Sequence, residues 1–208
     1  MRTISFKKPI KNFIVLEGLD GCGTTTQTSL LVKKLEEADI PTFGTNEPTK
    51  GSIGQFIRLI LQCKETVDPF TLALLFSADR NEHVYGKNGI ARQAEEEKKV
   101  ICDRYLFSSL AYQSLFMDYE TVASLNQYYP LPEYLFYIDL SPEECQKRMA
   151  TRGEEKELFE RLELQRKIDA NYKKTLSMLA DSDMKTIVID GRLTKQEIHN
   201  QICKVLKI

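Results

Sequence analysis

Residues 13–26 read Phe13-Ile-Val-Leu-Glu17-Gly18-Leu-Asp20-Gly21-Cys22-Gly23-Thr24-Thr25-Thr26, an apolar run followed by a glycine-rich turn and a helical pattern. The spacing of Gly18, Gly23 and Thr25 matches G-x-x-x-x-G-K-[ST] except at the lysine position, which Thr24 occupies. A loop of this kind points backbone N–H groups at one place and ends at a helix N-terminus, so it holds a phosphate group. We therefore expect nucleotide phosphates to bind at Gly18, Gly21, Cys22, Gly23, Thr24, Thr25 and Thr26.

The missing lysine separates binding from catalysis. In this class of loop the lysine adds a mobile positive charge on the outer phosphates, and the next Ser or Thr, here Thr25, helps to hold Mg²⁺. Binding by the backbone survives the substitution at Thr24, whereas phosphoryl transfer becomes an open question. The alternative interpretation is a glycine-rich turn from strand to helix that binds no ligand.

Five short apolar runs alternate with longer helical patterns along the chain. They occupy residues 13–16, 41–45, 100–102, 134–138 and 186–189. Continuously apolar runs are typical of strands that are buried on both faces of a parallel sheet. The sequence therefore predicts an α/β fold with a five-stranded parallel sheet flanked by helices.

The predicted helices are marked by apolar stripes and by capping signals. Residues 53–61 and 164–179 carry apolar side chains at helical spacing. N-terminal caps are expected at Asp68, at Ser141 before Pro142, and at Thr194 in a capping box with Glu197. Since no repeat, low-complexity tract or linker interrupts the pattern, we expect one domain over residues 1–208.

Composition limits the partners and the compartment. At 208 residues and 42% hydrophobic, the chain is long enough to bury a full core, and its net charge of −1 is no footprint for nucleic acid. The five cysteines lack metal-ligand spacing, which indicates reduced thiols. We see no leader pattern at the start and no run near the roughly 20 apolar residues of a membrane span. We expect a cytoplasmic protein without nucleic-acid or membrane partners.

Acidic residues stand at or just after the ends of all five predicted strands: Glu17, Glu47, Asp103, Asp139 and Asp190. Ligands of an open parallel sheet sit outside the carboxyl ends of its strands, so these side chains should gather near the ligand. We interpret Asp139 and Asp190 as solvated or turn-capping residues. Asp103 is followed by Arg104, and this pair can couple Mg²⁺ to a phosphate because carboxylate favours the cation and guanidinium binds phosphate bidentately. If Asp103-Arg104 is considered without the rest of the sequence, a surface ion pair is the simpler explanation.

Four segments occur together in an order and at a spacing that are characteristic. They are Phe13-Ile-Val-Leu-Glu-Gly-Leu-Asp-Gly, Asn46-Glu-Pro48, Leu74-Leu-Phe76-Ser-Ala-Asp79-Arg80-Asn-Glu-His83 and Asp103-Arg-Tyr-Leu-Phe-Ser-Ser-Leu-Ala111-Tyr112-Gln113. From about Asn12 to the C-terminus the chain resembles the thymidylate kinases. The resemblance implies a P-loop nucleoside monophosphate kinase fold with a short lid at about residues 148–160. It also implies transfer of a phosphoryl group from ATP, with Mg²⁺, to thymidine monophosphate, and a homodimer.

Carried over residue by residue, the resemblance implies an acceptor site. Phe76 would stack on the thymine ring, Arg80 would donate to its edge, and Tyr112 would lie against the sugar. Asp20 would accept from the 3′-hydroxyl, and Glu47, Ser109 and Gln113 would complete the substrate site.

The same resemblance implies the catalytic groups. Arg104 would hold the monophosphate, while Asp103 and Thr25 would work near Mg²⁺. Arg148 and Arg152 would act from the lid.

Simpler roles are open for several of these residues. Phe76 lies on an apolar helical stripe and is a candidate core residue, and Tyr112 is a candidate for helix packing. Asp79 and Arg80 are candidates for a solvated pair, and we interpret His83 as an exposed or capping side chain.

Three expected cations are absent. Thr24 replaces the loop lysine, Asn46 stands where bacterial relatives usually have arginine, and Leu158 occupies the place of a lid arginine. Each loss is worth on the order of 10²–10³ in rate, by analogy with removal of one oxyanion donor. Compensation is available from Arg148, Arg152, Lys156, Arg161 and Lys50.

Three hypotheses follow. The first is an active kinase for thymidine monophosphate in which other cations replace the lysine. The second is a catalytically impaired relative that binds nucleotides for sensing or regulation. The third is a kinase with altered acceptor choice, because Asn46 changes the surroundings of the acceptor phosphate.

Overall fold

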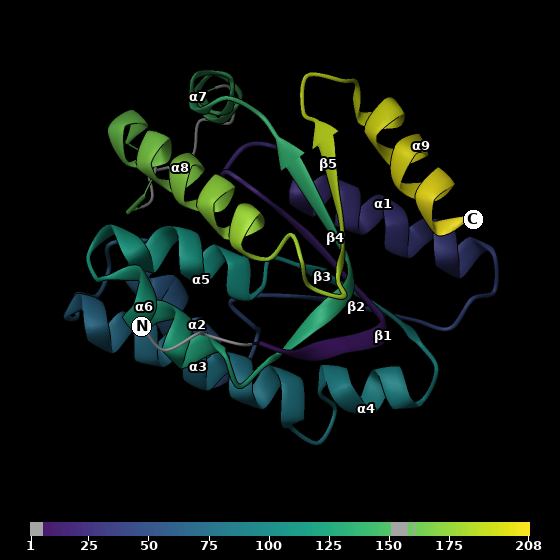
Figure 1. Cartoon of the computed structure of the whole chain (residues 1–208), viewed down its shortest axis with the longest axis horizontal. Coiled ribbons are helices and arrows are strands. Elements are labelled where there is room, and N and C mark those ends of the chain that lie inside the picture. Colours follow the sequence, from purple (N-terminus) through teal and green to yellow (C-terminus); the bar gives the residue numbers. More distant parts are fainter. Residues whose placement is uncertain (1–5, 151–157, 160) are drawn as a thin grey trace.

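The computed structural model of the protein describes residues 6–150, 158–159 and 161–208. In this part of the chain five parallel strands form one sheet in the order β2-β3-β1-β4-β5 (Figure 1). The strands are β1 (Lys7–Gly18), β2 (Thr42–Asn46), β3 (Lys99–Asp103), β4 (Pro130–Asp139) and β5 (Lys185–Asp190). Each predicted apolar run overlaps one of them, so the predicted α/β fold with a five-stranded parallel sheet is confirmed.

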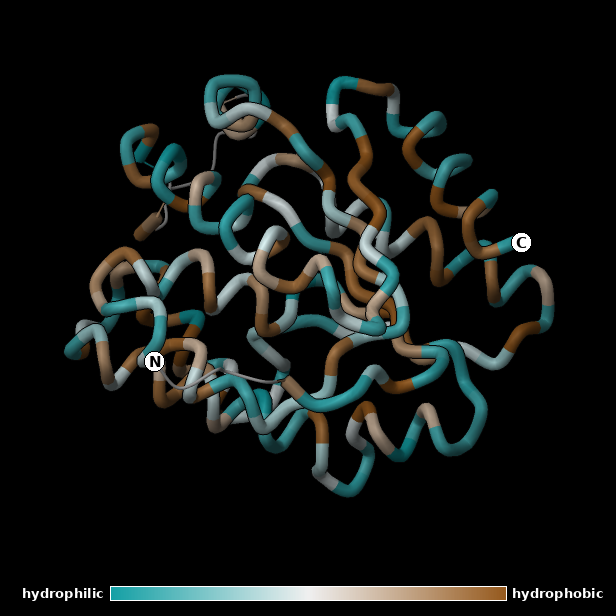
Figure 2. Tube along the Cα trace, viewed as in Figure 1, coloured by the Kyte–Doolittle hydropathy of each residue, from teal (hydrophilic) through white to brown (hydrophobic). Residues whose placement is uncertain are grey.

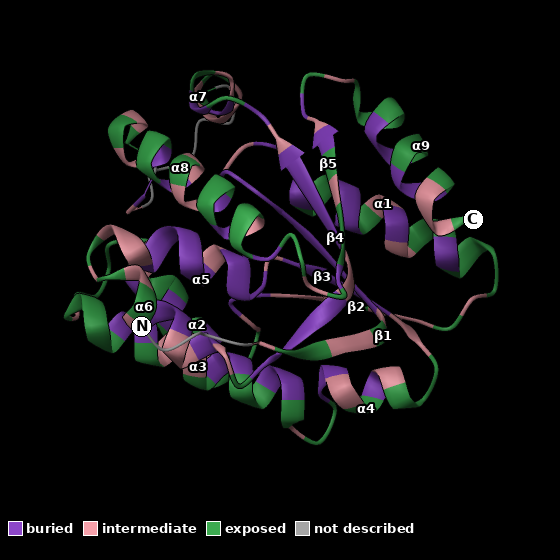
Figure 3. Cartoon of the chain, in the orientation of Figure 1, coloured by how far each residue is buried: buried purple, intermediate pink, exposed green. Residues whose placement is uncertain are grey.

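The core lies around the three central strands. In β1 the side chains of Phe13, Val15 and Leu16 are fully buried, and Figures 2 and 3 show apolar, buried residues concentrated along the middle of the sheet. The edge strands differ, since β2 is half-buried along most of its length and Val188 in β5 is 57% exposed. A strand at the edge has only one neighbouring strand and less cover from helices. The expectation of burial on both faces is therefore wrong for β2 and β5.

Helices cover both faces of the sheet (Figure 1). Along the described chain they are α1 (Thr24–Glu37), α2 (Ser52–Leu61), α3 (Pro69–Tyr85), α4 (Ile90–Glu95), α5 (Leu106–Tyr112), the 3₁₀ turn η1 (Gln113–Leu115), α6 (Tyr119–Asn126), α7 (Pro142–Ala150), α8 (Leu162–Met178) and α9 (Lys195–Leu206). α1 and α9 pack together on one side, whereas α4, α5 and α8 lie on the other, with α2, α3 and α6 beyond them. No helix in the described part of the chain is long and apolar enough to cross a membrane.

The predicted caps are confirmed at three helices. Asp68 Oδ1 accepts a hydrogen bond from the Phe70 N–H at 2.8 Å at the start of α3. Ser141 Oγ accepts from the Glu144 N–H at the start of α7, and Thr194 forms the expected capping box at α9. These local bonds explain where the three helices begin.

The strand register brings the functional segments to one edge of the sheet. Asp103 at the end of β3 is level with Leu16 in β1 and Asn46 in β2, and Asp139 is level with Asp190. The carboxyl ends of all five strands therefore meet at this edge, which is where ligands of open parallel sheets bind.

Candidate active site

The phosphate loop leaves β1 and runs directly into α1. Gly21 and Gly23 adopt left-handed φ angles of 89° and 106°, which favour glycine over residues with a Cβ. A Cβ on Gly21 would also lie 2.8 Å from the Cys145 carbonyl oxygen. The first backbone N–H groups of α1 have no partner within their own helix, so the loop ends in a site suited to an anion.

The side chains at the centre of the loop add no positive charge. Thr24, in the lysine position, begins α1 and is 4% exposed. Burial raises the pKa of the neighbouring Cys22 thiol to about 12, so this group stays neutral at physiological pH. The loop's own groups that suit a phosphate are therefore its backbone N–H groups and the helix dipole.

Thr25 and Asp103 meet beneath the loop. The Thr25 hydroxyl donates to Asp103 Oδ2 at 2.6 Å, while Asp103 Oδ1 is buried without a hydrogen-bond partner in the described structure. No cluster of three or more metal-binding His, Cys, Asp or Glu side chains occurs among the described residues. Mg²⁺ rarely needs one, because it is usually held by one or two carboxylates, waters and substrate phosphates. The unpartnered oxygen and the adjacent hydroxyl fit such an ion.

Arg104 links the loop to the acceptor side. Its φ angle of 67° turns the side chain back toward β1, where Nη1 donates to the Gly18 carbonyl at 3.0 Å. Nη2 donates to Asp20 Oδ1 at 2.5 Å, and the guanidinium lies 5.5 Å from the centre of the Tyr112 ring. Burial opposes the charge of Arg104, but Tyr112 and Asp20 outweigh it and raise its pKa further. This arginine is always charged.

A cavity of about 680 Å³ opens beside this group. It is lined by three predicted phosphate or metal residues, Thr25, Asp103 and Arg104. Six predicted substrate residues line it too: Asp20, Glu47, Phe76, Arg80, Tyr112 and Gln113. The tertiary structure thus brings segments from α1, α3 and α5 and the turn after β2 around one space.

Ser109 is placed differently from the other predicted substrate residues. It is 3% exposed and accepts a hydrogen bond from Arg80 Nη2 at 3.0 Å, so it lies behind Arg80. Phe76 and Tyr112 were each interpreted either as substrate contacts or as packing residues. Each of them lines the cavity and also packs against the core, so the two interpretations are compatible.

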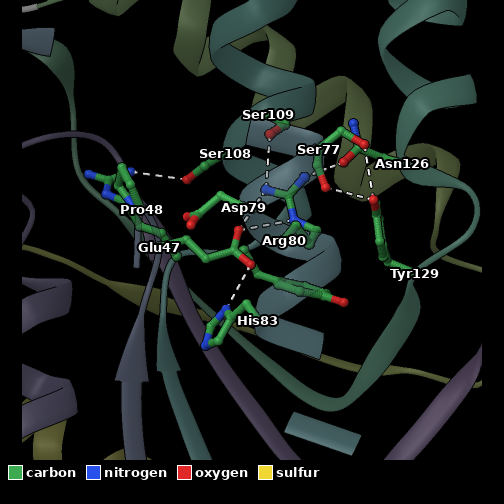
Figure 4. Close-up of polar contacts among 12 residues, drawn as sticks. Glu47, Pro48, Ser77, Asp79, Arg80, His83, Ser108, Ser109, Asn126 and Tyr129 are labelled. Atoms are coloured by element: carbon green, nitrogen blue, oxygen red, sulfur yellow. Dashed lines mark hydrogen bonds and ion pairs between the residues drawn. The ribbon is translucent and has the colours of Figure 1, made fainter. Parts of the chain in front are cut away.

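Two interpretations of α3 are wrong. Asp79 and Arg80 are not a solvated pair, since they are 3% and 1% exposed and bind different partners. His83 is neither exposed nor capping, since it is 8% exposed and contacts Glu47 (Figure 4). All three side chains turn inward toward the segment that follows β2.

Asp190 is a turn-capping residue, as expected. It accepts hydrogen bonds from the backbone and side chain of Arg192, and these bonds lower its pKa to about 2. Asp139, opposite in the sheet, does not line the cavity within the described structure.

The structure describes only the two ends of the predicted lid, residues 148–150 and 158–159. Arg148, on α7, donates to the carbonyls of Cys22 at 3.4 Å and Gly191 at 2.8 Å, so it joins the phosphate loop to the turn after β5. Leu158 donates its N–H to the Leu61 carbonyl at 3.0 Å and packs against the core. The predicted Arg152 and the candidate Lys156 lie outside the described residues. The other candidate cations, Lys50 and Arg161, are exposed.

Sequence reasoning missed two residues around this site, Arg58 and Gln165. Arg58 lines the cavity and donates to the Pro48 carbonyl at 2.5 Å. It is the only charged residue of α2, a signal that would have identified it. Gln165 donates to Asp20 at 3.2 Å, but no local pattern distinguishes it. Glu17, which we expected near the ligand, is instead fully buried against α5 and does not line the cavity within the described structure.

Comparison with known proteins agrees with this geometry. The sequence model of the family described as thymidylate kinase matches residues 16–202. A protein of Treponema pallidum named thymidylate kinase is 39% identical over 200 residues, covering 95% of this chain and 96% of its own length. Proteins of the same name from Methanocaldococcus jannaschii and Pyrococcus abyssi are 39% and 38% identical over 197 and 201 residues, in both cases 94% of this chain and 95% of theirs. The chain belongs to the thymidylate kinase family.

Proposed function

We propose that the protein transfers the γ-phosphate of ATP to thymidine monophosphate and forms ADP and thymidine diphosphate. The observation that carries the proposal is that one cavity is lined both by Thr25 and Asp103, at the carboxyl edge of the sheet, and by Phe76 and Tyr112 on the expected acceptor side. Phosphoryl transfer is mostly a matter of holding donor and acceptor phosphates in line in one space. Membership of the family and the names of the relatives support the same reaction.

The groups in the cavity suit a thymine base. Phe76 offers a ring face for stacking, and the Arg80 guanidinium, which can only donate, suits a base carbonyl. The Gln113 Oε1 atom is buried without a partner among the described residues, so it can accept from a ring N–H. A pyrimidine with an N–H beside its carbonyls satisfies both contacts.

Two arginines would bind the acceptor monophosphate. Arg104 and Arg58 both line the cavity and present guanidinium groups, which pair with phosphate bidentately. Asp20, which Arg104 and Gln165 hold by hydrogen bonds, would accept one from the sugar hydroxyl. The Tyr112 and Phe159 rings pack edge to face with their centres 5.3 Å apart, and they would form the wall of the cavity against the sugar.

In the reaction an oxygen of the acceptor phosphate attacks the γ-phosphorus of ATP. The new P–O bond forms as the bond to the β,γ-bridging oxygen breaks, and ADP leaves with that electron pair. The loop N–H groups orient the donor phosphates, and Asp103 and Thr25 would hold Mg²⁺ with oxygen ligands. When bound, Mg²⁺ neutralises charge on the phosphates.

We propose that Arg148 supplies part of the charge that Thr24 lacks. It already contacts the backbone of the phosphate loop at Cys22 and lies between that loop and the turn at Gly191. A guanidinium at this place strengthens binding of the outer phosphates through charge-assisted hydrogen bonds. Arg152, which the family resemblance also implicates, remains a proposal of the same kind.

A coupled assay with purified protein, ATP, Mg²⁺ and thymidine monophosphate tests the function. We expect turnover that requires all three additions. Calorimetry on the same preparation separates the alternatives. Absence of turnover, combined with measurable binding of both nucleotides, would contradict the kinase proposal and favour the catalytically impaired binding protein. Turnover with another nucleoside monophosphate in place of thymidine monophosphate would favour altered acceptor choice.

We further propose that the chain is one domain and forms a homodimer in the cytoplasm. Four apolar residues on α2 and α3 are exposed: Phe56, Leu59, Phe70 and Leu74. Such groups on two helices that pack together are typical of an interface. Sedimentation should give twice the 24.0 kDa chain mass for the wild type, and the mass of one chain for Phe70→Glu.

The proposed cytoplasmic location is supported by the cysteines. All five are free, which fits a reducing compartment.

A further inference from the structure

The Arg80 guanidinium is held by protein groups on three of its sides (Figure 4). Nε and Nη2 both donate to Glu47 Oε2, at 3.0 and 2.6 Å. Nη2 also donates to Ser109, and Nη1 donates to Asn126 Oδ1. A guanidinium carries five N–H groups. These contacts leave one N–H on Nη1 without a partner in the described structure, and Arg80 lines the cavity.

Two aromatic rings restrict the same group further. The Arg80 guanidinium carbon lies 5.3 Å from the centre of the Tyr105 ring and 5.8 Å from that of Tyr129. The Tyr129 hydroxyl donates a hydrogen bond to the carbonyl of Ser77, which lies in the same helix as Arg80. The plane of the guanidinium is therefore set by packing as well as by hydrogen bonds.

Glu47 is in turn shared between Arg80 and His83. Burial by itself raises the pKa of Glu47, but the charge of Arg80 and the contact with His83 outweigh it and hold the pKa below its ordinary value. Glu47 is thus a carboxylate and can only accept, so His83 Nδ1 carries a hydrogen and donates to Oε1 at 3.0 Å. In the neutral ring Nε2 then accepts from the Thr45 hydroxyl at 2.7 Å.

Another residue of α3, Asp79, also binds the turn that follows β2. One helical turn before His83, Asp79 accepts from the Thr49 N–H at 2.7 Å and from its hydroxyl at 2.6 Å. α3 therefore holds the chain on both sides of Glu47, at Thr45 and at Thr49. The two carboxylate oxygens of Glu47 accept from two different residues of α3, Arg80 and His83. His83 is not one of the described residues that line the cavity, so it acts through its partners Glu47 and Thr45, which both line it.

We propose that His83 is a positioning residue for selection of the acceptor base. Through Glu47 it fixes the direction of the last Arg80 N–H, which faces a base carbonyl in thymine but an amino group at the same place in cytosine. Two donors cannot pair, and a buried donor left without an acceptor is costly, so a fixed Arg80 rejects the amino base. A loosened Arg80 turns away and rejects it less. This inference rests on the proposed function, since it assumes that the acceptor is a pyrimidine nucleotide.

Steady-state kinetics of His83→Leu test the inference, with thymidine monophosphate and deoxycytidine monophosphate as the two acceptors. We expect the KM for thymidine monophosphate to rise about tenfold, and the ratio of kcat/KM between the two acceptors to fall by about the same factor. The KM for ATP should stay unchanged. His83→Asn, whose amide keeps a donor near the Nδ1 position, should restore most of both values.

His199 offers a matched control. It is also 8% exposed, but it lies on α9 and contacts Cys203, away from the cavity. His199→Leu should leave the acceptor ratio unchanged. The inference is overturned if folded His83→Leu keeps the wild-type acceptor ratio, or if it raises the KM values of ATP and thymidine monophosphate together.

A second variant covers the case in which His83→Leu does not fold. Thr45→Val removes the partner of Nε2 and should lower the acceptor ratio about threefold, and an unchanged ratio would again overturn the inference. Calorimetry of the wild type with thymidine monophosphate alone keeps the two proposals apart. If the wild type does not bind this nucleotide, the proposed function fails, whereas wild-type binding with unchanged variants refutes only the role of His83.

Discussion

Replacing Glu17 with glutamine should change how the stability of the protein depends on pH. Glu17 lies in the buried part of β1 and is 0% exposed. It accepts hydrogen bonds from the N–H groups of Tyr105 and Ser108 at 2.7 and 3.1 Å, and from the hydroxyls of Ser108 and Tyr172, both at 2.8 Å. It therefore joins β1 to the start of α5 and to α8. Glutamine has the same shape and no charge.

The magnitude follows from the displaced pKa of Glu17. Burial raises this pKa from 4.5 to about 7, although Arg104 and the hydrogen bonds to Ser108 and Tyr172 oppose it. The displacement corresponds to roughly 3 kcal/mol at about 1.4 kcal/mol per pH unit. Between these two values the folded protein keeps the proton while the unfolded chain releases it. The folded state thus binds more protons, so stability falls as pH rises from 4.5 to 7 and levels off above.

Urea unfolding at several pH values measures the effect. Between pH 5 and pH 8 the free energy of unfolding of Glu17→Gln should gain about 2.5 kcal/mol relative to the wild type. Glu95→Gln, which removes an exposed carboxylate, controls for the loss of one negative charge. A difference between Glu17→Gln and wild type that stays constant across this range would refute the assignment of a buried, proton-holding carboxyl group.

Three further predictions concern the proposed reaction. Thr24→Lys restores the loop cation and should raise kcat about a hundredfold, as measured in the coupled assay. An unchanged kcat would mean that another group already supplies the charge. Asp103→Asn keeps an acceptor for Thr25 but removes the carboxylate, so kcat should fall at least about a hundredfold and more Mg²⁺ should be needed for half-maximal rate. Wild-type rates at ordinary Mg²⁺ would contradict a metal role for this residue. Phe76→Ala removes the stacking face and should raise the KM for thymidine monophosphate about tenfold without changing that for ATP, whereas Phe76→Tyr should stay near wild type. Equal changes in both KM values would indicate a core role alone.

Local patterns in the sequence were enough to locate the strands, the phosphate loop and several helix starts. Apolar runs identify buried strands, glycine spacing identifies the loop, and caps such as Asp68 and Thr194 act within a few residues of themselves. The same patterns overstated the burial of β5, because a run of apolar residues does not reveal that its strand lies at the edge. Local chemistry therefore predicts elements better than it predicts their neighbours.

The candidate site shows the same division. The sequence placed Asp103 and Arg104 at the carboxyl edge of the sheet, because the carboxyl ends of parallel strands meet there, and placed Thr25 in the phosphate loop by glycine spacing. All three line the cavity. The inward turn of Asp79 and His83 was not foreseen, since their partners Thr49 and Glu47 lie 30 and 36 residues away. A polar residue on a helix looks the same in sequence whether it meets water or a buried partner.

By itself the sequence determined the α/β architecture, the phosphate loop with Thr24 in place of lysine, and the resemblance to one family of kinases. These follow from spacing over short stretches, where backbone geometry leaves few choices. Only the tertiary structure decided which side chains share the cavity, that Ser109 stands behind Arg80, and that Glu17 is buried with a raised pKa. Those outcomes arise because helices from distant segments of the chain pack around charged side chains and exclude water from them. Which side chains are buried in this way depends on the packing of the whole chain.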